Sequence, residues 1–286
     1  MAVREFKLIN ENDEEYSLMD IKKYCLLTNV NGLGLEYSNE YVQLSNIFIQ
    51  SSKKISQKPI TGTLNFINYD NFRTFVDFIE SSENLKFVYK IPYSDGTSEK
   101  YLKDVQVQSL TKSEKQTNGI LSEDISFDCL GLWYKEEETI YDMSEENGEL
   151  RWDFSWDGYF MDYGERILMY ENNSSAEAPV KIEIDGEAIN PKIDLYVNDE
   201  LYQSLEFPLT IESGEKLLYS SKINDFYIQK ENSDGTTEDL FDLDYIDFEN
   251  DNVIRIPAHS TCVITLSAEN EVANAQITIY PYYAAV

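Results

Sequence analysis

The sequence predicts a mainly β protein with two domains, and three observations support this fold class. Of the 286 residues, 21 are Tyr and 14 are Phe, residue types that favour pleated, half-buried strand surfaces. A chain of this length typically contains about two domains. Residues 1–138 carry 15 basic and 22 acidic side chains (net −7), whereas residues 139–286 carry 8 and 31 (net −23). We therefore expect domains at 1–138 and 139–286, with the acidic segment 135–149 at the boundary.

The first domain is expected to consist of strands and one helix. Residues 6–9 open a strand, and residues 60–67 alternate between apolar and other positions, the period of a half-buried strand. A Gly/Asn turn at 29–34 leads into residues 35–49, which predict one strand with mixed faces. Residues 51–59 follow as a basic loop.

One amphipathic helix is predicted after the strand at 60–67. Apolar side chains recur with helical spacing and form one stripe, consisting of Phe72, Phe75, Val76 and Ile79. Either Asn68 or Asp70 can cap its N-terminus, because a short side-chain acceptor satisfies the free amides of the first turn. The helix is expected to end near the polar residues 81–84.

A hairpin and a closing strand complete the first domain. Two β-rich runs over residues 85–110 flank Asp95-Gly96, a strong signal for a tight turn. A further strand is expected within residues 123–134.

The second domain is predicted to be an antiparallel β-sandwich. Short β-rich runs follow one another with turn residues between them. We expect about nine or ten such runs, including those at 178–184, 191–197, 201–207, 215–221, 225–230, 252–257, 260–267 and 273–280.

Charge and cysteine content narrow the function classes. The net charge of −30 repels phosphate and disfavours nucleic-acid binding, but it suits the wall of a conduit through which DNA passes. Cys25, Cys129 and Cys262 are widely separated, so each is expected to be a free, buried side chain. We expect no signal peptide, no membrane span and folding in a reducing cytoplasm.

His259 is the one histidine of the chain, and it can be interpreted either as a catalytic residue or as an ordinary turn or strand residue. Beside Ser260 and Cys262 it could belong to a catalytic pair, which also needs an orienting acid. No GxSxG motif is present, so an ordinary turn or strand histidine is the alternative that we favour. No enzyme activity, cofactor or metal is expected.

An acidic segment at 239–252 could hold calcium, which requires six to eight oxygen ligands. The central Gly of an EF-hand loop is missing, and apolar residues interrupt the carboxylates. A solvated acidic loop with buried anchors is therefore the preferred interpretation.

The aromatic cluster at 152–163 allows two functions. Trp152 and Trp156 share one face of a strand, which could pack in a core or against a neighbour, or could stack on sugar rings. We favour packing, and keep a carbohydrate-binding module for cell-wall glycans as the alternative function. Asp153, Asp157 and Asp162 form no specific glycosidase signal in so acidic a chain.

Gly32 and Gly34 form no dinucleotide-binding motif, because Glu36 stands where a third Gly is needed. Lys53, Lys54 and Lys58 cluster in an otherwise acidic chain, and we interpret them as a protein-docking edge. We expect contacts between subunits to use unpaired strand edges together with two segments, 53–58 and Tyr93 to Tyr101.

Residues 1–138 resemble the N-terminal domain of the distal tail proteins of siphoviruses that infect Gram-positive bacteria. The resemblance lies in REFKLINENDEEYSLMD (4–20), GLGLEYSNEYVQLSNIFI (32–49), and the two long segments at 58–92 and 101–134. Its most distinctive feature is the order of a strand, an NYDNF helix start, a long hairpin and a closing FDCLGLWY strand. The second half is similar in length and strand rhythm.

The resemblance implies an N-terminal β-sandwich with one helix, assembled into a hexameric belt, and a C-terminal galectin-like β-sandwich. It further implies a structural hub at the phage tail tip or baseplate. The ring would join the major tail tube protein to the tail-tip and receptor-binding proteins and form part of the DNA conduit, through which the tape-measure protein also passes. The location would be the virion, after assembly in the host cytoplasm.

Overall fold

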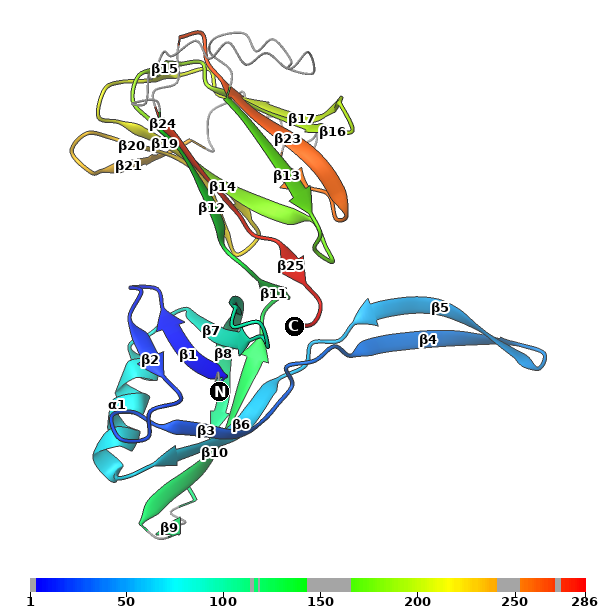
Figure 1. The fold of residues 1–286 in the computed structure, drawn as a ribbon, viewed down its shortest axis with the longest axis vertical. Helices are drawn as coiled ribbons and strands as arrows, with labels where there is room; N and C mark the ends of the chain where they lie inside the picture. The colour runs from blue at the N-terminus through cyan, green and yellow to red at the C-terminus, as the bar shows by residue number, and fades with distance from the viewer. Residues whose placement is uncertain (1–3, 114–115, 118, 143–165, 241–252, 271–273) are drawn as a thin grey trace. The chain divides into compact units, whose positions relative to one another are not determined.

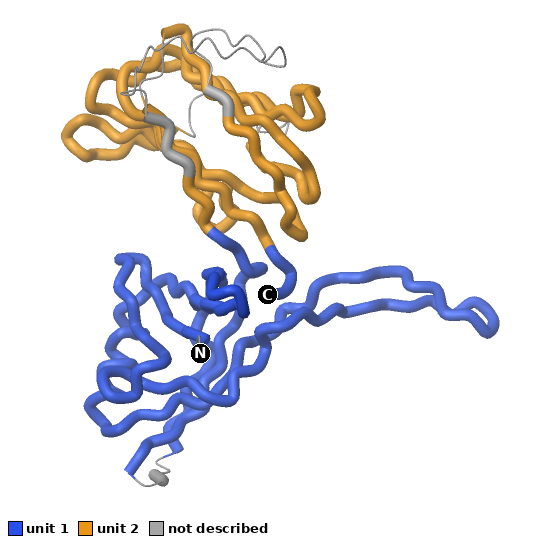
Figure 2. Tube along the Cα trace, viewed as in Figure 1, with its two compact units in different colours: residues 1–135, 283–286 blue, residues 136–282 orange. Residues whose placement is uncertain are grey.

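The structure is a computed structural model that describes residues 4–113, 116–117, 119–142, 166–240, 253–270 and 274–286. The chain divides into two compact units (Figure 2). Unit 1 comprises residues 1–135 together with 283–286, and unit 2 comprises residues 136–282. The expected mainly β architecture is confirmed, and the described residues contain the one expected helix (Figure 1).

Unit 1 is built on one antiparallel sheet, ordered β2-β1-β7-β8-β10-β6-β3. Its strands are β1 (Glu5–Asn10), β2 (Glu15–Ser17), β3 (Leu26–Asn31), β6 (Ile60–Phe66), β7 (Leu85–Pro92), β8 (Ser98–Leu110) and β10 (Ile120–Cys129). Two short strands add to it, β9 (Gln116–Thr117) on β10 and β11 (Trp133–Tyr134) on β8.

The two ends of this sheet meet, so that unit 1 closes on itself. Met19, just after β2, forms a β-bridge with Leu26 at the start of β3. The Leu27 amide also donates a hydrogen bond of 2.8 Å to the Leu18 carbonyl. Closure satisfies strand edges that would otherwise be exposed.

Helix α1 (Tyr69–Glu80) is the predicted helix, with the predicted apolar stripe and the cap at Asn68. The Asn68 side chain accepts a hydrogen bond of 2.9 Å from the Asn71 amide. Phe75 is fully buried between Tyr16 and Phe66, with ring centroids 5.2 and 5.7 Å away. The stripe therefore covers the core where the two ends of the sheet meet.

The hairpin predicted around Asp95-Gly96 is confirmed as β7 and β8. Gly96 has φ +90°, a conformation that glycine adopts without steric cost. The Tyr93 amide donates to the Thr97 carbonyl at 2.9 Å, and Asp95 Oδ1 accepts from the Thr97 amide at 2.9 Å. One face of this hairpin lies in the core of unit 1.

A second hairpin, which we call the arm, consists of β4 (Tyr37–Leu44) and β5 (Ile47–Ile55). It extends away from the rest of unit 1 (Figure 1). Two predictions for this region are wrong. Residues 35–49 contain parts of two strands rather than one, with the turn at Ser45, whose φ is +57°. Residues 51–55, predicted as part of a basic loop, belong to β5. The arm has no buried face, so no alternation marked its strands.

Unit 2 contains two larger antiparallel sheets. The first is ordered β12 (Glu137–Asp142), β24 (Asn274–Ile279), β14 (Ala178–Asp185), β19 (Lys216–Lys222), β20 (Asp225–Glu231) and β21 (Thr237–Asp239), with β22 (Arg255–Ile256) on β14. The second is ordered β13 (Arg166–Asn172), β23 (Ser260–Ser267), β16 (Lys192–Val197) and β17 (Glu200–Glu206). The short strands β15 (Ala188–Ile189) and β18 (Thr210–Ile211) pair with each other, and β25 (Tyr282–Tyr283) pairs with β11.

The two sheets of unit 2 share one apolar core, to which Ile182 and Tyr219 of the first sheet and Leu195 and Ile264 of the second contribute. Each of the eight β-rich runs named from the sequence contains a strand. Residues 137–142 of the acidic segment 135–149, which we expected at the domain boundary, form β12. Residues 143–149 lie outside the described part of the chain. The galectin-like assignment stays a prediction.

In the described ranges, no helix is both long and apolar enough to cross a membrane.

Candidate functional site

The arm is the most unusual surface of the described chain. Eighteen large hydrophobic side chains are exposed in the described residues, and nine of them fall within residues 35–55. Ile47 and Phe48, next to the turn, are 66% and 67% exposed. Concentrated exposed apolar surface marks an interaction site in a folded protein.

The strand register separates the two faces of the arm near its tip. Val42 lies opposite Ile49, and Leu44 lies opposite Ile47. Because directly paired residues share one face, these four side chains form a continuous aliphatic face. We call it the aliphatic tip face. The opposite face alternates polar and aromatic side chains, with Tyr41 opposite Gln50 and Gln43 opposite Phe48.

The half of the arm nearer the body of unit 1 is more polar. A bulge between Glu40 and Tyr41 interrupts the register. Beyond it, Lys53 Nζ lies 3.9 Å from the centre of the Tyr37 ring, and Lys54 is exposed. Lys53 and Lys54 therefore belong to a strand of the arm, and their role in subunit contacts stays a prediction.

The root of the arm is tightly packed. Gly32 has φ +91°, and a Cβ atom built there would lie 2.0 Å from the Pro59 carbonyl oxygen. The segment before β4 and the segment after β5 can therefore approach this closely only with glycine at position 32. The predicted docking residue Lys58 lies at this root, and its Nζ atom is 3.2 Å from Glu36 Oε2.

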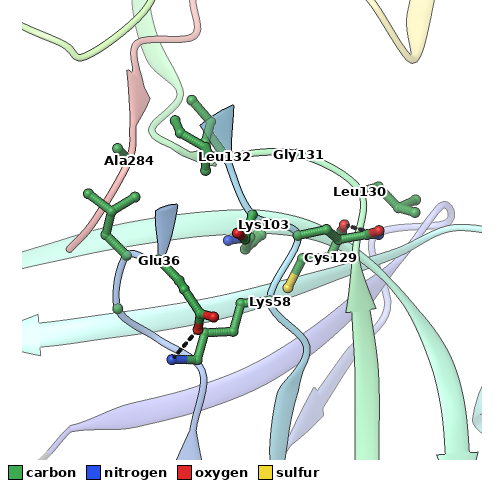
Figure 3. A pocket seen from close by; sticks show the side chains of 13 residues that line it. Glu36, Lys58, Lys103, Cys129, Leu130, Gly131, Leu132 and Ala284 are labelled. Atoms are coloured by element: carbon green, nitrogen blue, oxygen red, sulfur yellow. Dashed lines mark hydrogen bonds and ion pairs between the residues drawn. The ribbon is translucent and has the colours of Figure 1, made fainter. Parts of the chain in front are cut away.

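A cavity of about 380 Å³ opens beside the arm root (Figure 3). It is lined by the two segments at the arm root, by Lys103 of β8, by Cys129 at the end of β10, by the following loop 130–132 and by Ala284. Glu36 and Lys58 face each other across one side of it (Figure 3). Lys103 is 8% exposed, and Cys129 is 4% exposed.

Tyr93 and Tyr101, the other predicted contact residues, converge on one carboxylate. Their hydroxyls donate to Glu99 Oε2 at 2.5 and 2.6 Å, and Lys135 Nζ lies 2.7 Å from Glu99 Oε1. Hydrogen bonds from these three donors lower the pKa of Glu99 to about 2, and the bond from Lys135 has the largest effect. Tyr101 is buried and packs edge-on against Tyr283 at 5.5 Å, whereas Tyr93 is 42% exposed. Whether either takes part in subunit contacts stays a prediction.

Several candidate residues lie outside the described residues. These are Trp152, Trp156 and the three acids between 153 and 162, together with positions 241–252 of the possible calcium segment. In the described part of the chain, no three His, Cys, Asp or Glu side chains are grouped as metal ligands.

His259 occupies an exposed turn with φ +53°. The neighbouring Ser260 hydroxyl donates to the Pro257 carbonyl at 2.7 Å. The predictions for the cysteines are confirmed, since all three are free and buried.

Sequence reasoning missed the arm tip and Lys103. The Ser45-Asn46 pair between two apolar runs was the available signal for the tip turn. For Lys103, the signal was a lysine within an apolar alternation, since Tyr101 and Val105 on either side of it in β8 are buried.

Comparison with known proteins relates this architecture to phage tails. Residues 5–130 match the family model "Distal tail protein, N-terminal domain". Unit 1 is therefore similar to the N-terminal domain of distal tail proteins. The resemblance inferred from the sequence is therefore confirmed.

Two distal tail proteins of known sequence match part of the chain. The protein of Lactococcus phage SK1 is 27% identical over 154 residues, covering 52% of this chain and 51% of that protein. The protein of Lactococcus phage p2 is 28% identical over 124 residues, covering 42% and 41%. The matched region thus spans about half the length of these relatives or less.

Two solved structures share the fold of this chain over nearly its whole length. A chain of the phage P2 baseplate in its activated conformation with Ca matches with a TM-score of 0.69 at 20% identity, covering 100% of both chains. The SPP1 Dit protein, a hub adsorption apparatus of phages that infect Gram-positive bacteria, matches with a TM-score of 0.57 at 11% identity, covering 97% and 99%. At these identities the likeness concerns the fold.

Proposed function

We propose that this chain is a structural hub protein of a phage tail tip or baseplate and has no enzymatic role. In this proposal it forms a hexameric ring that joins the tail tube protein to the tail-tip and receptor-binding proteins. The distal tail protein domain and the relatives from phage tails support the proposal. The observation that carries it is the arm, which presents apolar side chains with no partner surface within its own unit.

The partner that we assign to the arm is a second copy of the chain. An isolated two-stranded hairpin is marginally stable in water, so the arm gains most from packing on a further surface. A contact between unlike surfaces of identical chains closes into a ring when the rotation between neighbours is suitable. The aliphatic tip face offers four neighbouring apolar side chains for such a contact.

The chain's charge fits the same role. A net charge of −30 disfavours adhesion of DNA, as required of a ring through which a genome and a tape-measure protein pass. We place the assembled protein in the virion, after assembly in the host cytoplasm.

The test is the mass of the purified chain in solution, measured by light scattering and followed by negative-stain imaging. For a chain of 33.2 kDa, annular particles with a mass of about six chains are expected. The double variant Val42→Ser/Ile49→Ser removes half of the aliphatic tip face and is expected to abolish these particles.

A matched control changes the opposite face of the same two strands. The double variant Gln43→Ser/Gln50→Ser is expected to leave the ring intact, because both side chains lie on the other face of the hairpin, away from the aliphatic tip face. Equal assembly of the two double variants would refute the role of this face. Charge reversal at Lys53, Lys54 and Lys58, or substitution of Tyr93, tests the other predicted contact residues separately.

A further inference from the structure

Lys103 occupies a position where the fold requires an apolar side chain. It pairs with Phe87 across β7 and β8, and paired residues share one face of a sheet. Phe87 is fully buried in the core of unit 1, and the neighbours of Lys103 on the same face, Tyr101 and Val105, are buried there too. A lysine is rarely buried without a paired charge.

No carboxylate balances this lysine within the described part of the chain. Its ammonium group lies 5.0 Å from the centre of the Trp133 ring, an aromatic contact in place of an ion pair. Burial lowers the pKa of Lys103, as expected when a charged group loses water without gaining an anion. Among the described residues, the lysine therefore has no anionic partner.

The cavity gives a ligand access to Lys103. Its volume of about 380 Å³ exceeds that of one water molecule about tenfold, so it can hold a polar side chain. The other cation at its wall, Lys58, is already paired with Glu36. Among the residues that line the cavity, Lys103 is therefore the one cation that no lining carboxylate balances.

We propose that this cavity binds a carboxylate side chain of a second copy of the chain, with Lys103 as its cation. The inference rests on the self-assembly proposed above and assigns a specific polar contact to it. Two observations favour a second copy as the source. The chain carries 53 acidic and only 23 basic residues, and the cavity lies at the root of the arm, so a copy seated along the arm reaches its mouth.

The experiment compares the reactivity of Lys103 in assembled and single chains. Both samples are treated with formaldehyde and a borane reductant, and methylation of each lysine is followed by peptide mass spectrometry. The single-chain sample is the Val42→Ser/Ile49→Ser variant. Methylation of Lys103 is expected to be at least about tenfold slower in the assembled protein, because a bound carboxylate fills the cavity and holds the ammonium group protonated.

Lys22, an exposed residue remote from the arm in sequence, serves as the internal control and is expected to react equally in both samples. Equal rates for Lys103 in the two samples would overturn the proposal.

If the wild-type protein stays a single chain, self-assembly fails and the cavity is tested by itself. Sodium acetate and sodium chloride are then compared at equal ionic strength. Slower methylation of Lys103, but not of Lys22, in acetate would support the carboxylate site without the ring. No difference between the salts would reject the site as well.

A Lys103→Met variant separates binding from a purely structural role. Methionine keeps an unbranched apolar stem against Trp133 and removes the buried charge, so Tm is expected to rise. The dissociation constant of the assembly is expected to increase at least about tenfold, because the carboxylate loses its cation. Unchanged assembly in this variant would contradict the proposal.

Discussion

Two hairpins of unit 1, β4–β5 and β7–β8, are similar in composition but lie in opposite surroundings. Both β4–β5 and β7–β8 are antiparallel, and both are rich in aromatic and β-branched residues. The β7–β8 hairpin places Phe87 and Tyr89 in the core, whereas every large hydrophobic residue of β4–β5 is exposed. The comparison teaches that strand formation follows local composition, while the burial of a strand depends on which other elements reach it.

The largest expected difference between the hairpins concerns one phenylalanine in each. Phe87→Ala is expected to lower the free energy of unfolding by about 3–5 kcal/mol, because it opens a cavity in a closed core. Phe48→Ala, at a side chain that is 67% exposed, is expected to change it by less than about 0.5 kcal/mol. Urea unfolding of both variants measures the difference. Similar losses would mean that the arm is folded against its own unit.

The root of the arm provides a second comparison, between two glycines. Gly32→Ala is expected to cost roughly 2–3 kcal/mol, from strain at positive φ and overlap with the Pro59 carbonyl. Gly34→Ala is the control, since no atom lies within 4 Å of the added Cβ. Thermal unfolding of both variants is the measurement. A neutral Gly32→Ala would show that the root opens freely.

The β7–β8 hairpin is also held by Glu99, and this contribution depends on pH. The pKa of Glu99 falls from 4.5 to about 2 through hydrogen bonds from Lys135, Tyr101 and Tyr93. A lowered carboxyl pKa stabilises the fold above pH 4.5, and this stabilisation is lost as the pH falls from 4.5 towards 2.

Glu99→Gln is therefore expected to cost about 1 kcal/mol near pH 7, a modest value because solvent screens the partly exposed ion pair. The deficit is expected to shrink at pH 3 in urea unfolding curves. Glu80→Gln, at an exposed position in α1, is the control. A deficit independent of pH would rule out this carboxylate as its cause.

The smallest expected effect lies within the arm. Lys53→Ala removes the contact with the Tyr37 ring, worth about 0.5 kcal/mol at an exposed site. Amide hydrogen exchange in β4 and β5 is expected to become about twofold faster. Lys54→Ala, on the other face, should leave exchange unchanged. Equal acceleration by both variants would indicate a general effect of charge.

Local patterns predicted those parts of the fold in which each element has one buried face. The stripe around Phe75 and the cap at Asn68 were sufficient for α1, and Asp95-Gly96 was sufficient for the β7–β8 turn. In unit 2, short alternating runs such as 178–184 predicted strands because both sheets bury one face. The arm was predicted only as one strand with mixed faces, because burial imposes no period on residues 37–55 that would separate its two strands.

The candidate site depended on contacts between distant parts of the chain. The cavity joins the arm root, Lys103, Cys129 and Ala284, which are far apart in sequence. The docking role predicted for Lys53, Lys54 and Lys58 stays a prediction. However, spacing alone could not show that Lys58 forms an ion pair with Glu36, whereas no described carboxylate pairs with Lys103.

The return of residues 283–286 to unit 1 has a consequence for biosynthesis. Unit 2 is inserted, in sequence, between Lys135 and the segment that packs Tyr283 against Tyr101. A ribosome makes the chain from its N-terminus, so all of unit 2 is translated before Ala284 can form its part of the cavity wall. Nascent chains therefore expose an unfinished cavity, which is completed only on chains that already carry the whole second unit.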